Sequence, residues 1–241
     1  MKYIYILKTG ETFDTTKEKF GDFDVWVKKF LGKKAKNTKV EVIDVLNNQT
    51  LPNLQSAKSF IITGSHSMVS AELPWSIALE KYIRKIKKRN IPLLGICYGH
   101  QLIAKALGGI SGYSKKAKDI EIGQVKIKRT IDSLNDPLFK DFALKFDAYE
   151  THYQSAIKLP AKAVVLAFNS EEKHQAVRFS KTIWGVQFHP EFDNIIMKEY
   201  ILNQKEKLEE LGFNVDKLLD KVKNCDMSNK ILSNFVEFSI R

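Results

Sequence analysis

The chain contains only two cysteines among its 241 residues, Cys97 and Cys225. Two cysteines form at most one disulfide, so a disulfide-stabilised scaffold is excluded. No CxxC or HExxH spacing is present, and the common zinc motifs are therefore missing. The N-terminal apolar run at residues 3–7 is too short for a signal peptide. We expect a cytoplasmic protein with two reduced thiols and no metal, in which Cys225 has ordinary thiol reactivity.

Long hydrophobic runs and arginine are also scarce. No segment approaches the roughly 20 apolar residues of a membrane-spanning helix, so no membrane partner is expected. The formal net charge is +11, yet 34 of the 39 basic residues are lysine and only five are arginine. Surfaces that read nucleic acids rely on arginine, and the densest basic run, at residues 81–89, keeps the apolar spacing of an amphipathic helix. We interpret the lysines as solvated helix faces and expect no nucleic acid, with an acidic protein partner as an alternative.

The first half of the chain alternates short β-branched runs with helical patterns. Strands are predicted at residues 3–7, 40–45, 59–63 and 91–96, and helices at residues 25–31, 74–88 and 98–107. Such alternation is typical of α/β proteins with right-handed crossovers. It predicts a mainly parallel, open, flavodoxin-like sheet with helices on both faces.

After Gly109 the pattern changes. Alternating apolar and polar residues at 120–128, 144–149, 163–168 and 183–188 predict antiparallel strands added to the same sheet. From Asp193 onward helices are predicted at residues 195–211, 215–222 and 230–238, the last capped by Ser228. Because no linker or repeat interrupts the chain, we expect one domain over residues 1–241. Its core covers about residues 1–195, and a helical C-terminal appendage covers about residues 193–241.

The strongest local motif is Gly95-Ile-Cys97-Tyr-Gly99, at the junction of a predicted strand and a predicted helix. It is the cysteine form of the G-x-S-x-G nucleophile elbow, a turn so tight that only glycine fits on either side. The nucleophile sits in strained backbone above the sheet, and the positive end of the following helix favours a thiolate. A buried core cysteine between loop glycines is the alternative, but the strand–helix junction favours a nucleophile.

A cysteine nucleophile needs a proton donor for its leaving group and a third group that orients this donor. The candidates are His189 and Glu191, separated by Pro190. Proline disfavours the α conformation of the residue before it, so His189 should be extended. Residues two apart in an extended chain project to the same side. The sequence therefore predicts that the Glu191 carboxylate lies next to the His189 ring.

A further candidate segment is His152-Tyr153-Gln154, which follows the end of a predicted strand. Loops at such strand ends reach the ligand in open α/β sheets, so we expect this segment to line the substrate site. His66, in the loop after the third predicted strand, fits a pocket wall and a solvated loop equally well. His174, in a highly charged turn, is expected on the surface.

Two segments together resemble the class I (triad) glutamine amidotransferase family. Gly95-Ile-Cys-Tyr-Gly-His-Gln101 resembles its nucleophile motif, and Gln187-Phe-His-Pro-Glu191 resembles its downstream His–Glu motif. The resemblance covers roughly residues 40–195. It is closest to the GMP-synthase-like branch, which also holds stand-alone γ-glutamyl peptidase-like proteins.

Carried over residue by residue, the resemblance implies that Cys97 is the nucleophile, His189 the acid and base, and Glu191 the group that orients His189. It also implies that Gln101 helps to bind glutamine and that the backbone N–H of Tyr98 donates to the oxyanion.

One loop departs from the family pattern. The family takes its second oxyanion donor from a Gly-Gly-Pro loop after the third strand, whereas this loop reads Thr63-Gly64-Ser65-His66-Ser67. The amide of Gly64 or of Ser65 can serve as the donor. This departure favours the stand-alone subgroup.

The activity implied by the resemblance is hydrolysis of the side-chain amide of L-glutamine through a cysteine thioester, which releases ammonia and glutamate. No metal or organic cofactor is needed for this half-reaction, and a separate ammonia-accepting synthetase is a possible partner. The alternative is a stand-alone γ-glutamyl hydrolase or peptidase. A third hypothesis, a non-catalytic binding protein of the same fold, is disfavoured because such a protein does not need Cys97, His189 and Glu191 together.

Overall fold

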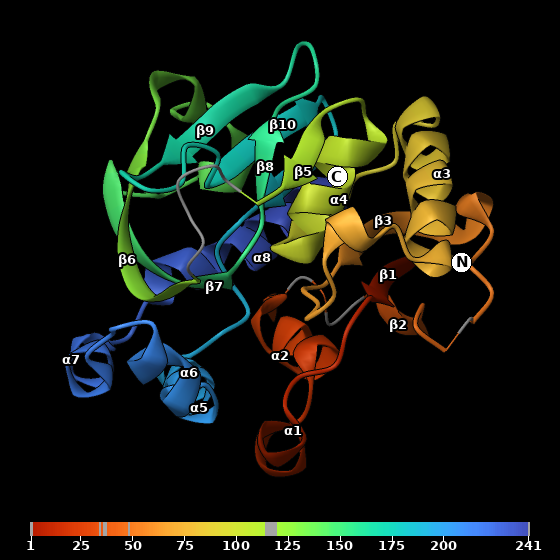
Figure 1. Cartoon of the computed structure of the whole chain (residues 1–241). Coiled ribbons are helices and arrows are strands. Elements are labelled where there is room, and N and C mark those ends of the chain that lie inside the picture. The colour runs from red at the N-terminus through yellow and green to blue at the C-terminus, as the bar shows by residue number, and fades with distance from the viewer. Residues whose placement is uncertain (1, 34, 36–37, 48, 114–119, 241) are drawn as a thin grey trace.

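The computed structural model describes residues 2–33, 35, 38–47, 49–113 and 120–240. Within them the main sheet has the order β2-β1-β3-β4-β11-β10-β9-β6-β7, and β5 and β8 form a separate small sheet (Figure 1). The strands are β1 Tyr3–Lys8, β2 Lys39–Asp44, β3 Ala57–Ile62, β4 Leu93–Ile96, β5 Ile110–Gly112, β6 Glu121–Arg129, β7 Lys145–His152, β8 Ser155–Lys158, β9 Val164–Phe168, β10 Ala176–Ser180 and β11 Ile183–Val186. The helices are α1 Asp14–Phe20, α2 Phe23–Phe30, α3 Pro74–Lys88, α4 Tyr98–Ala106, α5 Asn194–Asn203, α6 Lys205–Glu210, α7 Val215–Lys221 and α8 Asp226–Ser239.

The sheet has a parallel half and an antiparallel half. Strands β2, β1, β3, β4 and β11 pair in parallel, whereas β10, β9, β6 and β7 extend the sheet with antiparallel pairs. This order confirms the predicted flavodoxin-like sheet with antiparallel additions. One assignment is wrong: β11, predicted as an antiparallel addition, pairs in parallel with β4 and is antiparallel only to β10. All four of its residues are buried, as expected for a strand inside the sheet.

Helices cover both faces of the sheet, as predicted. Successive side chains of a strand point to opposite faces. Ile4 and Ile6 of β1 share a buried cluster with Val27 of α2 and Phe235 of α8. Tyr5 and Leu7 of the same strand contribute to a second cluster, which includes residues of α3 and α4. The C-terminal helix α8 therefore packs against one face of the sheet.

The C-terminal helices differ from the prediction in two details. The helix predicted over residues 195–211 is two helices, α5 and α6, because Gln204 between them leaves helical geometry (φ −111°, ψ 12°). Ser228 does not cap α8, since the helix begins after Cys225 and the Ser228 hydroxyl donates to the Cys225 carbonyl at 2.8 Å. Figure 1 shows α5, α6 and α7 grouped at one end of the molecule.

Four short elements were not predicted from the sequence: α1, β5, β8 and β10. Each is between three and seven residues long, too short for a periodic pattern to emerge. None of the helices in the described part of the chain has the length and apolar character needed to span a bilayer.

Candidate active site

Two neighbouring parallel strands bring the two sequence motifs together. β4 ends at Ile96 and β11 at Val186, and these two residues are register partners. Cys97 follows β4, and its backbone N–H donates to the Val186 carbonyl at 2.8 Å. His189 follows β11 by three residues. Because the carboxyl ends of parallel strands share one edge of a sheet, Cys97 and His189 line the same cavity.

The backbone at Cys97 forms a sharp elbow. Its φ of 48° and ψ of −102° cost a non-glycine residue about 1–3 kcal/mol. A Cβ at Gly95 would collide with the Gly99 backbone, and a Cβ at Gly99 would lie 2.6 Å from the Ile62 carbonyl oxygen. Helix α4 begins at Tyr98, so the unpaired amides and the positive end of the helix lie beside the cysteine.

The Cys97 thiol is almost enclosed, with 6% of the residue exposed. Gln187 Nε2 donates to its Sγ at 3.6 Å, and the sulfur lies 3.9 Å from the Thr151 carbonyl oxygen. Sequence reasoning assigned no role to Gln187, although it lies in the His–Glu motif.

His189 and Glu191 meet, as predicted, but through a different backbone geometry. His189 Nδ1 lies 2.8 Å from Glu191 Oε1, and both residues are buried. The chain turns at Pro190 and Glu191 instead of continuing extended, and the Phe192 N–H donates to the His189 carbonyl at 3.4 Å. This turn, and not an extended segment, brings the carboxylate to the ring.

The surroundings of His189 favour its charged form. Burial lowers the pKa of the ring, but the charges of Glu191 and Cys97 outweigh burial and raise that pKa to about 10. Phe192 and Phe23 stack on the ring with centroid distances of 4.2 and 6.4 Å, which restricts its orientation. Among the described residues, Nε2 of His189 has no hydrogen-bond partner. This nitrogen is therefore free to exchange a proton with a group in the cavity.

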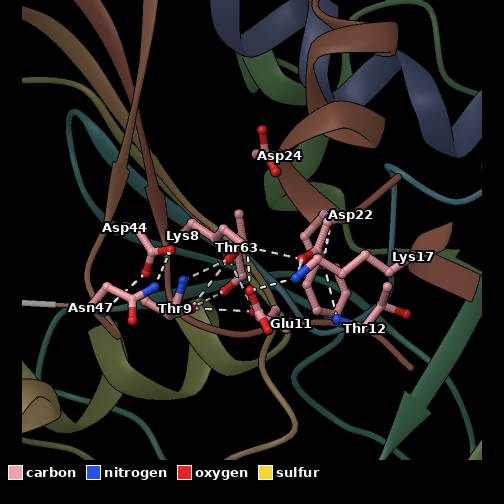
Figure 2. A network of polar contacts seen from close by, with 12 residues as sticks. Lys8, Thr9, Glu11, Thr12, Lys17, Asp22, Asp24, Asp44, Asn47 and Thr63 are labelled. Carbon is pink, nitrogen blue, oxygen red and sulfur yellow. Dashed lines mark hydrogen bonds and ion pairs between the residues drawn. The ribbon is translucent and has the colours of Figure 1, made fainter. Parts of the chain in front are cut away.

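The loop after β3 is anchored by a buried polar network (Figure 2). The Thr9 N–H donates to Thr63 Oγ1 and the Thr9 hydroxyl to the Thr63 carbonyl, both at 3.0 Å. Lys8 Nζ pairs with Asp22 Oδ2 at 2.9 Å in the same network. The segment after β1 thus holds the end of β3 in place, and Asp22 at the start of α2 holds the end of β1.

The same loop carries the two candidates for the second oxyanion donor. Ser65 lines the cavity of Cys97, whereas Gly64 packs beside His189. A Cβ at Gly64 would lie 3.1 Å from His189 Cε1, so the absence of a side chain there leaves room for the ring. A Cβ at Gly10 would lie 2.5 Å from Ser65 Cα, so this glycine lets the segment after β1 approach the loop.

Gln101 lines the cavity, but its amide group is committed within the protein. Its Nε2 donates to the Gln154 carbonyl at 2.5 Å and to Gln187 Oε1 at 3.1 Å. The Gln154 side chain is held in turn by Ser70, whose hydroxyl accepts a 2.5 Å hydrogen bond from Nε2. These contacts make Gln101 a positioning residue for Gln154 and for the amide donor to Cys97.

The predicted segment His152-Tyr153-Gln154 lies in the cavity wall, next to Cys97, Tyr98 and Gln101. The Tyr98 phenol itself points to α3, where it donates to Ser76 Oγ at 2.7 Å, so the hydroxyl is engaged away from Cys97. His152 is 6% exposed and lies close to two glutamates.

A further part of the cavity wall is aromatic. The cavity has a volume of about 250 Å³. Phe13, Phe23, His66 and Tyr200, called here the aromatic wall, line it together and contact one another with ring centroids 4.7–6.2 Å apart. Sequence reasoning did not find this wall, apart from one of the two options for His66. Its members come from three separate parts of the chain and carry no shared motif.

Two expectations about single residues are wrong. Cys225 is buried, and burial raises the pKa of its thiol to about 12, so it lacks ordinary thiol reactivity. His174 is half-buried, and its Nδ1 lies 2.6 Å from the Ala156 carbonyl oxygen.

Comparison with known proteins identifies the family of this chain. Residues 20–207 match the family described as Glutamine amidotransferase class-I. The chain belongs to the class I glutamine amidotransferase family. Its match reaches beyond the residues 40–195 of the sequence resemblance and includes α2 and α5. A crystal structure of a glutamine amidotransferase from Thermotoga maritima has a TM-score of 0.78 and 22% identity, covers 100% of this chain and 99% of that one, and shows the same fold.

Two curated relatives of this chain carry names that describe different activities. γ-Glutamyl peptidase 4 of Arabidopsis thaliana is 26% identical over 149 residues, which are 62% of this chain and 59% of that protein. One subunit of the glutamine-hydrolysing GMP synthase of Pyrococcus furiosus is 42% identical over 113 residues, which are 46% of this chain and 57% of that protein. The chain thus spans less than two thirds of the length of either relative.

Proposed function

We propose that this protein hydrolyses the side-chain amide of L-glutamine through a catalytic triad of Cys97, His189 and Glu191. The observation that carries the proposal is the position of His189. One ring nitrogen contacts a buried carboxylate at 2.8 Å, and the other is unpaired among the described residues, in a cavity shared with a cysteine at a strained elbow. This is the arrangement of nucleophile, acid–base and orienting group that acyl transfer requires.

In the first half-reaction the Cys97 thiolate attacks the amide carbon of glutamine. The carbonyl oxygen becomes negatively charged, and backbone amides at Tyr98 and in the loop at Ser65 donate to it. Ser65 is the better candidate for the second donor because it lines the cavity. Each oxyanion donor typically contributes about 3–4 kcal/mol to lowering the barrier. His189 gives its Nε2 proton to the departing nitrogen, ammonia leaves, and a γ-glutamyl thioester remains.

In the second half-reaction the now neutral His189 removes a proton from water as the water attacks the thioester. The bond to Cys97 breaks, the sulfur leaves as thiolate, and glutamate is released. His189 ends as the imidazolium with which the cycle began. The Glu191 carboxylate stabilises that imidazolium throughout.

The ammonia acceptor that we propose is a separate synthetase. The name of the Pyrococcus furiosus relative describes one subunit of a glutamine-hydrolysing synthase, which supports an arrangement with the synthetase on another chain. The cavity leaves the sulfur shielded, as suits a site that keeps ammonia from solvent.

The aromatic wall favours a second candidate, a γ-glutamyl hydrolase or peptidase. The leaving group must depart toward His189, which protonates it, and Phe23 of the wall stacks on this ring. A leaving group larger than ammonia would find apolar contacts there. The Arabidopsis thaliana relative bears the name of such a peptidase.

The proposal is tested with the purified chain and glutamine, by measuring release of ammonia and glutamate. We expect equal amounts of both products and a covalent γ-glutamyl adduct on Cys97 when the reaction is quenched early. Cys97→Ser should remove both, whereas Cys225→Ser should leave both unchanged. Undiminished glutamine hydrolysis by Cys97→Ser would contradict the proposal.

A further inference from the structure

A second cluster of ionisable side chains lies beside the Cys97 cavity, on the antiparallel pair β6 and β7. Glu121 is the register partner of His152, and Gly123 is the partner of Glu150. Glu150 and His152 are two residues apart on β7, so their side chains share one face of the sheet. Gly123, opposite Glu150, adds no side chain to this cluster. A rigid ladder of backbone hydrogen bonds thus gathers two carboxylates and one imidazole.

The three side chains converge on one point. His152 Nε2 lies 3.6 Å from Glu121 Oε2 and 3.6 Å from Glu150 Oε2. One ligand atom from each residue lies within 4.8 Å of the other two. Only 3% of the His152 side chain is exposed. In the described part of the chain, neither His152 Nε2 nor Glu121 Oε2 has a hydrogen-bond partner, although both atoms are buried.

Two carboxylates this close together, one buried and one partly buried, need compensating positive charge. Glu172 adds another negative charge nearby. Protons can supply the missing charge, and so can a metal ion.

We propose that Glu121, Glu150 and His152 form a binding site for a divalent transition-metal ion of the zinc class. Imidazole nitrogen and carboxylate oxygen are common ligands of such first-row metal ions, and sites with three protein ligands complete their shell with water. Ligand atoms at zinc-binding distance stand about 3.3 Å apart in a tetrahedron. The two 3.6 Å separations from His152 Nε2 therefore need to shorten by only a few tenths of an ångström, and the two carboxylate oxygens, which lie within 4.8 Å of each other, close on the ion by side-chain rotation.

The surroundings support the ligands in the manner of metal sites. Gln175 Nε2 donates to Glu150 Oε2 at 2.5 Å and fixes the orientation of that carboxylate. Such partners outside the ligand shell typically account for roughly 10- to 100-fold in metal affinity. Glu121 is the most accessible of the three ligands, with 21% of its side chain exposed, and gives the ion a path from solvent.

The ion would lie next to the catalytic cavity without taking part in the reaction. It would fix the end of β7 at His152, which directly follows Thr151 and lies two residues before Gln154. The Thr151 carbonyl contacts the Cys97 sulfur, and the Gln154 carbonyl accepts from Gln101. The proposed site is therefore an anchor for one wall of the cavity. Its existence does not depend on which amide the enzyme hydrolyses.

The test uses Zn²⁺ and the Cys97→Ser variant, because the thiolate–imidazole pair of Cys97 and His189 could itself bind zinc. Isothermal titration should show one Zn²⁺ per chain. Titrations repeated in buffers of different ionisation enthalpy near pH 7 should show proton release, because carboxylate and imidazole groups bind the ion in their deprotonated forms. Adding Glu121→Gln should weaken binding by more than about 100-fold, since it removes a ligand and not merely a supporting residue.

Two further variants keep the test decisive. Glu150→Gln in the same background should also abolish binding, whereas Glu171→Gln, an exposed glutamate outside the cluster, should leave it unchanged. Zn²⁺ should raise the melting temperature of Cys97→Ser but not of the two ligand variants, provided that these remain folded by circular dichroism. No uptake of Zn²⁺ at micromolar concentrations, or equal affinity with and without Glu121→Gln, would overturn the proposal.

Discussion

The two thiols of the chain have opposite surroundings. Cys97 lies at the start of α4 and receives a hydrogen bond from Gln187, both of which stabilise a negative sulfur. Cys225 lies at the start of α8 and lines no part of the catalytic cavity, and burial raises the pKa of its thiol to about 12. Both start a helix, so the helix terminus alone does not distinguish them. What distinguishes the two thiols is the histidine and the amide donor that lie next to Cys97.

A glutamine-mimicking electrophile should therefore label Cys97 and leave Cys225 untouched. Peptide mapping by mass spectrometry measures the distribution of the label. Cys225→Ser should be labelled as fast as the unmodified chain, and Cys97→Ser should not be labelled. A label found mainly on Cys225 would refute the assignment of the nucleophile.

The pKa of His189 gives a second prediction at this scale. Glu191→Gln removes one of the two charges that raise this pKa, so the pKa should fall from about 10 toward the ordinary histidine value of about 6.5. The rate constant kcat should fall by on the order of 100-fold or more, while glutamine binding stays nearly unchanged. NMR titration of the ring and steady-state kinetics measure the two effects.

The same shift links His189 to stability. Because the folded-state pKa lies above the unfolded value, the His189–Glu191 contact contributes fully below about pH 6.5 and is lost as the pH rises through about 10. The difference in unfolding free energy between the unmodified chain and Glu191→Gln should therefore shrink toward alkaline pH. A difference that is independent of pH, together with unchanged kcat, would show that Glu191 does not act through a charged His189.

At the scale of single elements, the sequence predicted an element correctly where its apolar pattern and its boundary residue indicate the same limits. Helix α3 was predicted residue for residue because Pro74 suits a first helical turn and the apolar stripe runs its full length. The break between α5 and α6 was missed because the residues around Gln204 are good helix formers, and tertiary packing decides there. β10 was missed because it follows a polar turn and spans only five residues.

The elbow between β4 and α4 depends on two glycines, and Gly99 offers the cleaner test. A Cβ there would meet the backbone carbonyl of Ile62, which cannot move without shifting β3. Gly99→Ala should lower the free energy of unfolding by about 1–3 kcal/mol and reduce activity by displacing Cys97. Urea denaturation with an unchanged m-value measures the first effect.

The matched control is Gly112→Ala in β5, where a Cβ would make an ordinary 3.6 Å contact with Ile157 Cδ1. Its effect should stay within about 0.5 kcal/mol. Equal stability of the two variants would show that the elbow is looser than its geometry implies.

At the scale of the whole molecule, sequence reasoning reached the parts of the site that local motifs encode. Cys97, His189 and Glu191 were predicted because each lies in a short motif at a strand end, and parallel strands bring such ends together. The aromatic wall and the Glu121–Glu150–His152 cluster were not predicted. Their members are brought together by tertiary packing or by the register of β6 and β7, neither of which follows from residue spacing.

Gln101 shows a further limit of motif reasoning. The motif located it correctly in the cavity wall, but not the partners that occupy its amide group. These partners, Gln154 and Gln187, lie 53 and 86 residues away in the sequence. A motif can thus identify a position in a site without determining whether the side chain meets the substrate or another side chain.

The choice between glutamine and larger γ-glutamyl compounds also depends on the whole cavity. The site around Cys97 and Gln101 is polar and tightly connected, whereas the aromatic wall on the side of His189 could accept an apolar leaving group. Phe13 is half-buried in this wall, with its ring centroid 4.7 Å from that of His66 and 5.2 Å from that of Tyr200. We expect glutamine to be hydrolysed by the isolated chain and γ-glutamyl dipeptides to be weaker substrates, because Phe13 limits the space.

Phe13→Ala should therefore raise kcat/KM for a dipeptide with a bulky apolar second residue relative to kcat/KM for glutamine. A tenfold change in this ratio corresponds to about 1.4 kcal/mol of barrier. Steady-state kinetics with both substrates measure the ratio, and Ile195→Ala, at an exposed position outside the cavity, is the control that should not change it. A dipeptide preference of tenfold or more in the unmodified chain would instead assign the enzyme to the hydrolases, because the wall would then already bind the leaving group. A ratio unchanged by Phe13→Ala would show that the leaving group departs by another route and that the wall has no part in substrate choice.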